Sequence, residues 1–107
     1  MNTPPPHHAL PLSHLLRAAP EARLVRGGEV TVTGLAYDSR RVEPGMLFVA
    51  VPGFTTDGHR FVADAIGRGA SAVVVLADRV EAGAVRLDGL PSGVPCAVAP
   101  DTRRVLA

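Results

Sequence analysis

Polar side chains that could do chemistry gather at both ends of one apolar run, residues 46–51. Before this run stands YDSRR at residues 37–41, which combines a phenol ring, an acid, a hydroxyl and two guanidinium groups. After it stands PGFTTDGH at residues 52–59, with two glycines, two hydroxyls and an acid close to an imidazole. Such groups either carry out acid–base catalysis or bind phosphates and other polar ligands.

Catalysis has little support from these residues. Asp57 and His59 have the types needed for an acid–base pair. Asp38 and Ser39, taken together with His59, have the types found in a hydrolase triad. However, Ser39 lacks the sequence of a nucleophile elbow, so we predict no catalytic residue in this chain. A turn closed by side chain–backbone hydrogen bonds is the alternative interpretation of residues 38–40.

The loop that follows the apolar run has the composition of a ligand-binding loop. Gly53 and Gly58 allow the backbone to approach a ligand closely. Thr55 and Thr56 supply hydroxyl groups, and Phe54 supplies a ring for stacking. The loop also leads into a predicted helix, whose free N–H groups attract anions such as phosphate. The sequence therefore predicts that this loop contacts a ligand.

The two polar clusters are predicted to form one site. If residues 29–36 form a strand parallel to residues 46–51, both clusters emerge at the same edge of a sheet, where open α/β sheets bind ligands. Asp57 is placed to cap the following helix and to use some of its N–H groups itself. Arg40 is a better candidate for a phosphate clamp than Arg41, and both arginines fit a solvated surface equally well.

The composition describes one small domain with an aliphatic core. With 107 residues, of which 47% are apolar and 4% aromatic, the chain must build its core from Val, Ala and Leu. The net charge of +1 argues against a domain that binds nucleic acid mainly through its charge. All basic residues are Arg, so the chain lacks the Lys with which a P-loop holds ATP.

The sequence also bears on the cellular location. Cys96 is the single cysteine, so no disulfide can form within the chain, which fits a reducing cytoplasm. No segment reaches the roughly 18 apolar residues of a membrane span. The first residues lack the basic start and the apolar run of a signal peptide. We therefore expect a cytoplasmic protein without a membrane span.

Periodicity and turn residues predict the elements that position the two clusters. Residues 1–9 hold three consecutive prolines and two histidines and are expected to be a disordered leader without a metal site; the domain covers residues 10–107. Helices are expected around residues 10–16 and 60–68, and strands at residues 23–26, 29–36, 46–51, 72–76 and 94–99. The apolar stripe of the second helix, expected to face the core, consists of Phe61, Val62, Ala65 and Ile66.

The order of these elements predicts the fold class. A strand, a helix and a strand between residues 46 and 76 form a βαβ unit, whose two strands are parallel. The fold class is therefore α/β, with a small mixed, largely parallel sheet and flanking helices. Residues 78–93 are rich in Gly and charge and are expected to be a loose surface excursion. Asp101 is placed to cap a last helix that stops at residue 107, as in a segment of a longer protein.

Three stretches together resemble a known family. They are GLAYDSRRVEPGMLFVAVPG at residues 34–53, DGHRFVADAIGRGASAVVV at residues 57–75 and VPCAVAPDTRRVLA at residues 94–107. The chain resembles the N-terminal domain of the Mur ligases, cytoplasmic ATP-dependent enzymes that add amino acids to UDP-N-acetylmuramoyl peptides in peptidoglycan synthesis. Within that family it is most similar to the MurE type, which adds meso-diaminopimelate or L-lysine, and the MurF type, which adds D-alanyl-D-alanine, is the alternative.

The resemblance implies the site residues and the partners. Those implied to contact the UDP moiety are Tyr37, Ser39, Phe54, Thr55 and Thr56, and the possible supporting residues are Arg40, Gly53, Asp57, Gly58 and His59. Residues 54–56 depart from the His-Gln-Ala-like sequence of some relatives. The implied partners are a UDP-N-acetylmuramoyl peptide and the central ATP-binding domain of the same protein, with no nucleic acid.

The resemblance also implies what the chain does not do. In the intact enzyme, ATP and magnesium would activate a carboxyl group of the substrate as an acyl phosphate. The P-loop and the carbamylated lysine of the family have no counterpart in this sequence, so the segment alone is expected to be inactive. Two functions from other classes remain as alternatives: a stand-alone hydrolase that uses Ser39 and His59, and an interaction module without a small ligand.

Overall fold

The structure is a computed structural model. It describes residues 10–17, 19, 21–52, 57–83, 85–91 and 93–102. The predicted leader at residues 1–9, the loop residues 53–56 and all but the first residues of the predicted last helix lie outside these described ranges.

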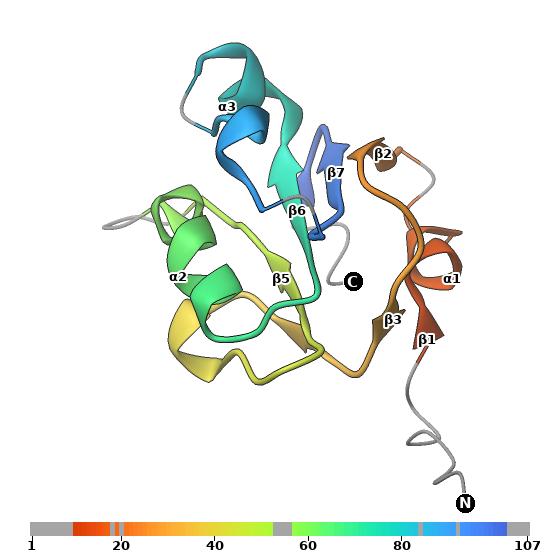
Figure 1. The fold of residues 1–107 in the computed structure, drawn as a ribbon. Coiled ribbons are helices and arrows are strands. Elements are labelled where there is room, and N and C mark those ends of the chain that lie inside the picture. The colour runs from red at the N-terminus through yellow and green to blue at the C-terminus, as the bar shows by residue number, and fades with distance from the viewer. Residues whose placement is uncertain are drawn as a thin grey trace, which may run out of the picture.

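A five-stranded sheet forms the centre of the molecule (Figure 1). Its strands, in spatial order, are β2 (Arg23–Arg26), β7 (Cys96–Ala99), β6 (Ala72–Leu76), β5 (Leu47–Val49) and β4 (Leu35–Ala36). The four strands from β7 to β4 are parallel to one another, and only β2 runs antiparallel to its neighbour. The prediction of a mixed, largely parallel sheet is confirmed.

The predicted βαβ unit is present between β5 and β6. The chain leaves β5, passes through the 3₁₀ helix η2 (Gly58–Phe61) and the α-helix α2 (Val62–Gly67), and returns as β6, parallel to β5. Gly69 ends the helix in the left-handed region, with φ of 105°, and donates its N–H to the Ile66 carbonyl at 3.0 Å. A Cβ on Gly69 would lie 2.8 Å from Pro44 Cα, so the close packing of this turn also requires glycine.

Residues 29–36 were predicted to form one strand, but they contain two short strands, β3 and β4. β3 (Thr31–Val32) pairs antiparallel with β1 (Leu10–Pro11) in a separate two-stranded sheet, whereas β4 joins the main sheet beside β5. The alternation of Val and Thr does describe a half-buried strand, since Val32 is buried and Thr31 exposed. Periodicity does not specify the partner, and here the partner changes after two residues.

The N-terminal helix is shorter than predicted because its first two predicted residues belong to a strand. Leu10 and Pro11 pair with β3, so α1 spans Leu12–Arg17. Figure 1 shows α1, β1 and β3 together on the side of the main sheet opposite α2.

Residues 78–93 are more ordered than predicted. They include most of α3 (Ala77–Glu81) and the 3₁₀ helix η3 (Leu87–Gly89). Val85 is buried and belongs to the core, and Val80 packs against it. The prediction of a loose excursion was wrong because Ala77, Val80 and Leu90 also pack against the core, and such tertiary contacts stabilise short helices.

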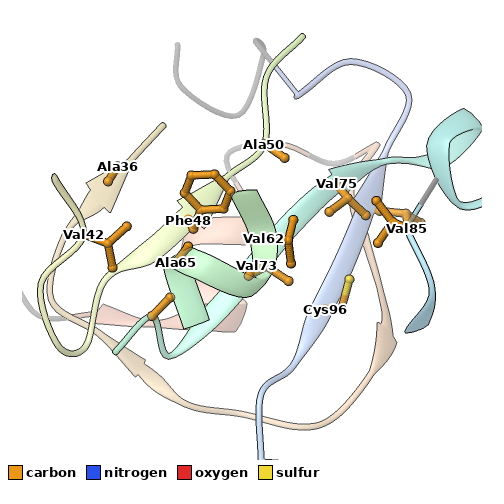
Figure 2. Close-up of a cluster of buried hydrophobic side chains, with 12 residues drawn as sticks. Ala36, Val42, Phe48, Ala50, Val62, Ala65, Val73, Val75, Val85 and Cys96 are labelled. Carbon is orange, nitrogen blue, oxygen red and sulfur yellow. The ribbon is translucent and has the colours of Figure 1, made fainter. Parts of the chain in front are cut away.

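Two apolar clusters fill the two faces of the sheet. Successive residues of β5 alternate between them, with Phe48 on the α2 face and Leu47 and Val49 on the α1 face. Figure 2 shows the α2 face, where Val62 and Ala65 of α2 lie over Phe48 and Val73. The buried side chains are mostly Val, Ala and Leu, as the composition predicts. Among the described helices, none has the length and apolar character needed to cross a membrane.

Candidate functional site

A cavity of about 580 Å³ lies beyond the carboxyl ends of β4 and β5. It is lined by Tyr37, Asp38, Ser39, Arg40, Phe48, Val51, Pro52, Gly58, Phe61 and Asp64. Four of these residues come from the first polar cluster, and two, Pro52 and Gly58, come from the second. β4 runs parallel to β5, so the chain leaves both strands at the same edge of the sheet. The described residues of the two clusters therefore line the same cavity, and a single site made by both clusters stays a prediction.

Two aromatic rings border this cavity. Tyr37 is 66% exposed and Phe61 is 39% exposed, whereas Phe48, which also lines the cavity, is fully buried. Phe61 was predicted to belong to the core stripe of the second helix, but only Val62 and Ala65 of that stripe are buried. Phe61 instead presents an aromatic surface to the cavity, which is suited to stacking a planar ligand group.

Asp64 is a site residue that the sequence analysis did not identify. The pKa of Asp64 is lowered, first by a hydrogen bond from the Ser39 hydroxyl and then by Arg68, whose Nε lies 3.1 Å from Oδ2. Ser39 is only 5% exposed, so its hydroxyl and the carboxylate form one corner of the cavity. The available signal was the spacing: Asp64 follows Phe61 by three residues and therefore lies on the same side of the helical segment.

Asp38 holds the turn that positions Ser39. Its carboxylate caps the 3₁₀ helix η1 (Ser39–Arg41) by accepting the Arg40 N–H at 3.0 Å. The same carboxylate binds the Arg40 guanidinium at two points, with Nε at 3.0 Å and Nη2 at 2.8 Å. Hydrogen bonds from the Arg40 side chain and backbone lower the pKa of Asp38 to about 2. The turn interpretation of residues 38–40 is thus correct for Asp38, and the turn also forms one wall of the cavity.

Gly58 lies where the second loop returns to the end of β5. Its N–H donates to the Val51 carbonyl at 3.0 Å. A Cβ at this position would lie 2.8 Å from Val51 N and 2.9 Å from Val51 O, which are backbone atoms that cannot move aside freely. Glycine is therefore required here by the close approach of two backbone segments, which closes one side of the cavity.

His59 is a structural residue and not a partner of Ser39. Its side chain is 2% exposed, and the described lining of the cavity does not include it. Nε2 accepts the Leu76 N–H at 2.9 Å, so the ring hydrogen is on Nδ1, which lies 2.6 Å from Asp57 Oδ1. With both ring nitrogens engaged, His59 has no free position with which to accept a proton from Ser39. The structure thus speaks against the hydrolase alternative.

Asp57 connects this histidine to α3. It caps η2 through the His59 N–H at 3.0 Å, as predicted, and it binds Arg79 Nε at 2.8 Å. Partial burial by itself raises the pKa of Asp57, but the hydrogen bonds from the His59 amide, Arg79 and the His59 ring outweigh it and lower the pKa overall. Sequence reasoning missed Arg79 because it stands 22 residues away from Asp57 in the chain.

The remaining predicted residues lie outside the described ranges. They are Gly53, Phe54, Thr55 and Thr56. Their contact with a ligand stays a prediction, supported by the position of the flanking residues Pro52 and Gly58 in the cavity lining. In the described ranges, no group of three or more His, Cys, Asp or Glu side chains is arranged to hold a metal ion.

This chain is similar in sequence to known proteins. A family model described as "Mur ligase family, catalytic domain" matches residues 31–101. A UDP-N-acetylmuramoyl-L-alanyl-D-glutamate–2,6-diaminopimelate ligase of Geobacillus thermodenitrificans is 43% identical over 96 residues, which are 90% of this chain and 17% of that protein. A ligase of the same name from Solibacter usitatus is 63% identical over 46 residues, which are 43% of this chain and 9% of that protein.

A solved structure shares the fold. The crystal structure of MurF from Acinetobacter baumannii matches with a TM-score of 0.67 and 23% sequence identity, over 92% of this chain and 20% of that one. The chain thus spans less than a fifth of the length of the first curated relatives that it matches. The family match contains the cavity and four of the five strands of the main sheet. The chain belongs to the Mur ligase family.

Proposed function

We propose that this chain is the domain that binds the UDP end of UDP-N-acetylmuramoyl-L-alanyl-D-glutamate in an ATP-dependent ligase of peptidoglycan synthesis. The intact enzyme adds a diamino acid to this substrate in the cytoplasm. The names of the relatives from Geobacillus and Solibacter support 2,6-diaminopimelate as that amino acid. The solved MurF structure supports the fold but not the choice of substrate, because its sequence identity is only 23%.

The observation that carries the proposal is the cavity between the two polar clusters. Tyr37 and Ser39, which the family resemblance assigns to the UDP moiety, both line it. Its volume of about 580 Å³ is in the range of pockets for small ligands. Tyr37 and Phe61 supply stacking surfaces, and polar groups at one corner supply hydrogen bonds. A nucleotide combines a planar base with polar substituents and therefore suits this lining.

The mechanism of this domain is binding and orientation, and not bond formation. The chain contains no lysine with which to hold the phosphates of ATP, and its described residues form no metal cluster. These residues do not fit ATP and magnesium, which we assign to another part of the enzyme. Binding energy from the remote UDP group orients the reacting end of the substrate and so contributes to turnover without contact at the reacting atoms.

The test is a ligase assay of the full-length protein. With ATP, magnesium and UDP-N-acetylmuramoyl-L-alanyl-D-glutamate, we expect ADP release that depends on 2,6-diaminopimelate. L-Lysine in its place tests the choice of diamino acid. The MurF-type alternative predicts instead a requirement for the UDP-tripeptide and D-alanyl-D-alanine. ADP release with neither pair of substrates would refute the proposal.

The 107-residue chain offers a complementary test. We expect it to bind UDP and to leave ATP intact, since it has no lysine for a P-loop. The measurements are calorimetric titration with UDP and phosphate release from ATP, compared with a heat-killed sample. Turnover of ATP above that control would contradict the assignment of catalysis to another part of the enzyme.

A further inference from the structure

The 3₁₀ helix η2 carries two residues of the cavity lining, and it is held from outside the cavity. Gly58 at its start and Phe61 at its end both line the cavity. Asp57 caps η2 but is not among the described lining residues. The direction in which η2 presents Gly58 and Phe61 therefore depends on how firmly Asp57 is held.

One short stretch at the end of β6 holds η2 at two points. The buried Leu76 donates its N–H to His59 Nε2 at 2.9 Å. Three residues later, Arg79 Nε donates to Asp57 Oδ2 at 2.8 Å. β6 ends at Leu76 and α3 begins at the next residue, so no loop separates the two donors. Both contacts thus come from one continuous, ordered segment.

α3 gives the Arg79 side chain a fixed starting point. Ala77 and Val80 of α3 pack against the buried cluster on the α2 face of the sheet, which includes Val85. The Val85 N–H donates to the Arg79 carbonyl at 3.2 Å and so holds the Arg79 backbone itself. A change of the Arg79 side chain therefore tests its guanidinium contact rather than the fold of α3.

The two oxygens of the Asp57 carboxylate have different partners. Oδ1 lies 3.0 Å from the His59 backbone nitrogen and 2.6 Å from its ring Nδ1, both within η2. Oδ2 accepts from Arg79, which belongs to α3. The Oδ1 bonds keep the local turn closed, whereas the Oδ2 bond joins the turn to another element. Without Arg79, η2 would stay formed but would be held at one point, through His59, instead of two.

These contacts point to a role for Arg79 in substrate binding, which rests on the function proposed above. We propose that Arg79 is a positioning residue for the UDP-linked substrate: through Asp57 it fixes η2 in the orientation in which Gly58 and Phe61 line the cavity. Arg79 acts through Asp57 and not by contact with the ligand. Its contribution to stability is small, because the side chains of Arg79 and Asp57 are 31% and 30% exposed and water screens their charges.

The substitution Arg79→Gln in the full-length protein tests this role, because it keeps most of the side-chain length and removes the charge. We expect the dissociation constant for UDP and the Michaelis constant for the UDP-linked substrate to rise about three- to fivefold, the effect of one partly exposed ion pair. The Michaelis constant for ATP and the melting temperature should change little. Arg79→Lys restores a cation opposite Asp57 Oδ2 and should recover most of the affinity.

Asp78→Asn is the matched control. Asp78 Oδ1 accepts from Nη1 of the same guanidinium at 3.2 Å, and the Asp78 side chain is 70% exposed. Its substitution should change neither the dissociation constant for UDP nor the Michaelis constant for the UDP-linked substrate. Asp57→Ala provides a second comparison: if Arg79 acts through Asp57, adding Arg79→Gln to Asp57→Ala should weaken UDP binding no further.

Three results would overturn the role of Arg79. Unchanged UDP affinity in Arg79→Gln would show that the ion pair does not position the site. Equal rises in the Michaelis constants for ATP and for the UDP-linked substrate would show a general loss of structure. A full further loss on top of Asp57→Ala would show that Arg79 acts by another route. Failure of the unmodified protein to bind UDP would instead refute the proposed function itself, and this role with it.

Discussion

Two aspartates close the same kind of turn in this molecule: Asp38 lines the cavity, and Asp57 is not among its lining residues. Asp38 caps η1 and Asp57 caps η2, each by accepting the N–H of the second residue ahead through Oδ1 at 3.0 Å. Each aspartate also binds the side chain of that second residue, which is Arg40 in one turn and His59 in the other. The local hydrogen-bonding pattern is the same in both places.

The side chains that the two aspartates bind differ in burial. The Arg40 side chain is 80% exposed, whereas the His59 side chain is 2% exposed and accepts a backbone N–H from β6. Water screens the exposed pair, so it contributes little to stability and leaves its turn available to a ligand. The buried pair fixes η2 to the core. The same capping motif therefore stabilises the fold where the partner side chain is buried, and forms part of a binding surface where the partner is exposed.

The largest expected effect on this comparison comes from His59→Ala. The substitution removes a buried ring and leaves the Leu76 N–H without its acceptor. We expect the free energy of unfolding to fall by about 3 kcal/mol, which corresponds to a loss of roughly 10–20 °C in melting temperature. Arg60→Ala, a change at the neighbouring exposed residue, is the control and should have almost no effect. A thermal melt that shifts equally little for both variants would contradict the structural role of His59.

The second effect separates the two aspartates directly. Asp57→Ala removes a helix cap and the partner of His59 and Arg79, so we expect a loss of about 1–2 kcal/mol in the free energy of unfolding. Asp38→Ala removes an equivalent cap whose side-chain partner, Arg40, is exposed, and it should cost less. Chemical denaturation of both variants gives the comparison. An equal loss in both would show that burial does not distinguish the turns.

The pH dependence of stability tests how much the ionised Asp57 carboxylate contributes to the folded state. The pKa of Asp57 is lowered from its ordinary value of 3.8, so its ionised form stabilises the folded state above that pH. As the pH falls below 3.8, this contribution is lost. The difference in stability between the unmodified chain and Asp57→Asn should therefore be constant at pH 5–7 and shrink below about pH 4. A difference that grows on acidification would have the wrong sign.

The smallest effect concerns Ser39→Ala and appears in binding. The serine oxygen lines the cavity, so its loss should weaken binding of the UDP-linked substrate to the full-length enzyme by about 0.5–1.5 kcal/mol. The Michaelis constants for ATP and the amino acid should stay nearly unchanged, because the UDP group is remote from the bond that forms. A variant that melts at a lower temperature yet retains its substrate affinity would remove Ser39 from the site.

The sequence by itself determined the local features of this protein. Asp38 and Asp57 cap their turns, and Gly69 ends α2. Gly45, with φ of 92°, has the positive φ that a type II turn requires, and in this turn the Met46 N–H donates to the Glu43 carbonyl at 3.1 Å. The parallel order of β5 and β6 also followed from the sequence. These features depend on residues a few positions apart, or on a connection whose geometry allows one arrangement.

Only the tertiary structure decided the roles of the side chains around these turns. His59 has the residue type of a catalytic base, and the N–H of Leu76 makes it a structural residue. Asp64 has the position of an exposed helix residue, and Ser39 makes it part of the cavity. Arg79 stands in a segment that resembles a loop, and its bond to Asp57 ties α3 to η2. Each role depends on a contact between residues 17 to 25 positions apart, and such contacts form only after the strands have paired and the helices have packed on the sheet.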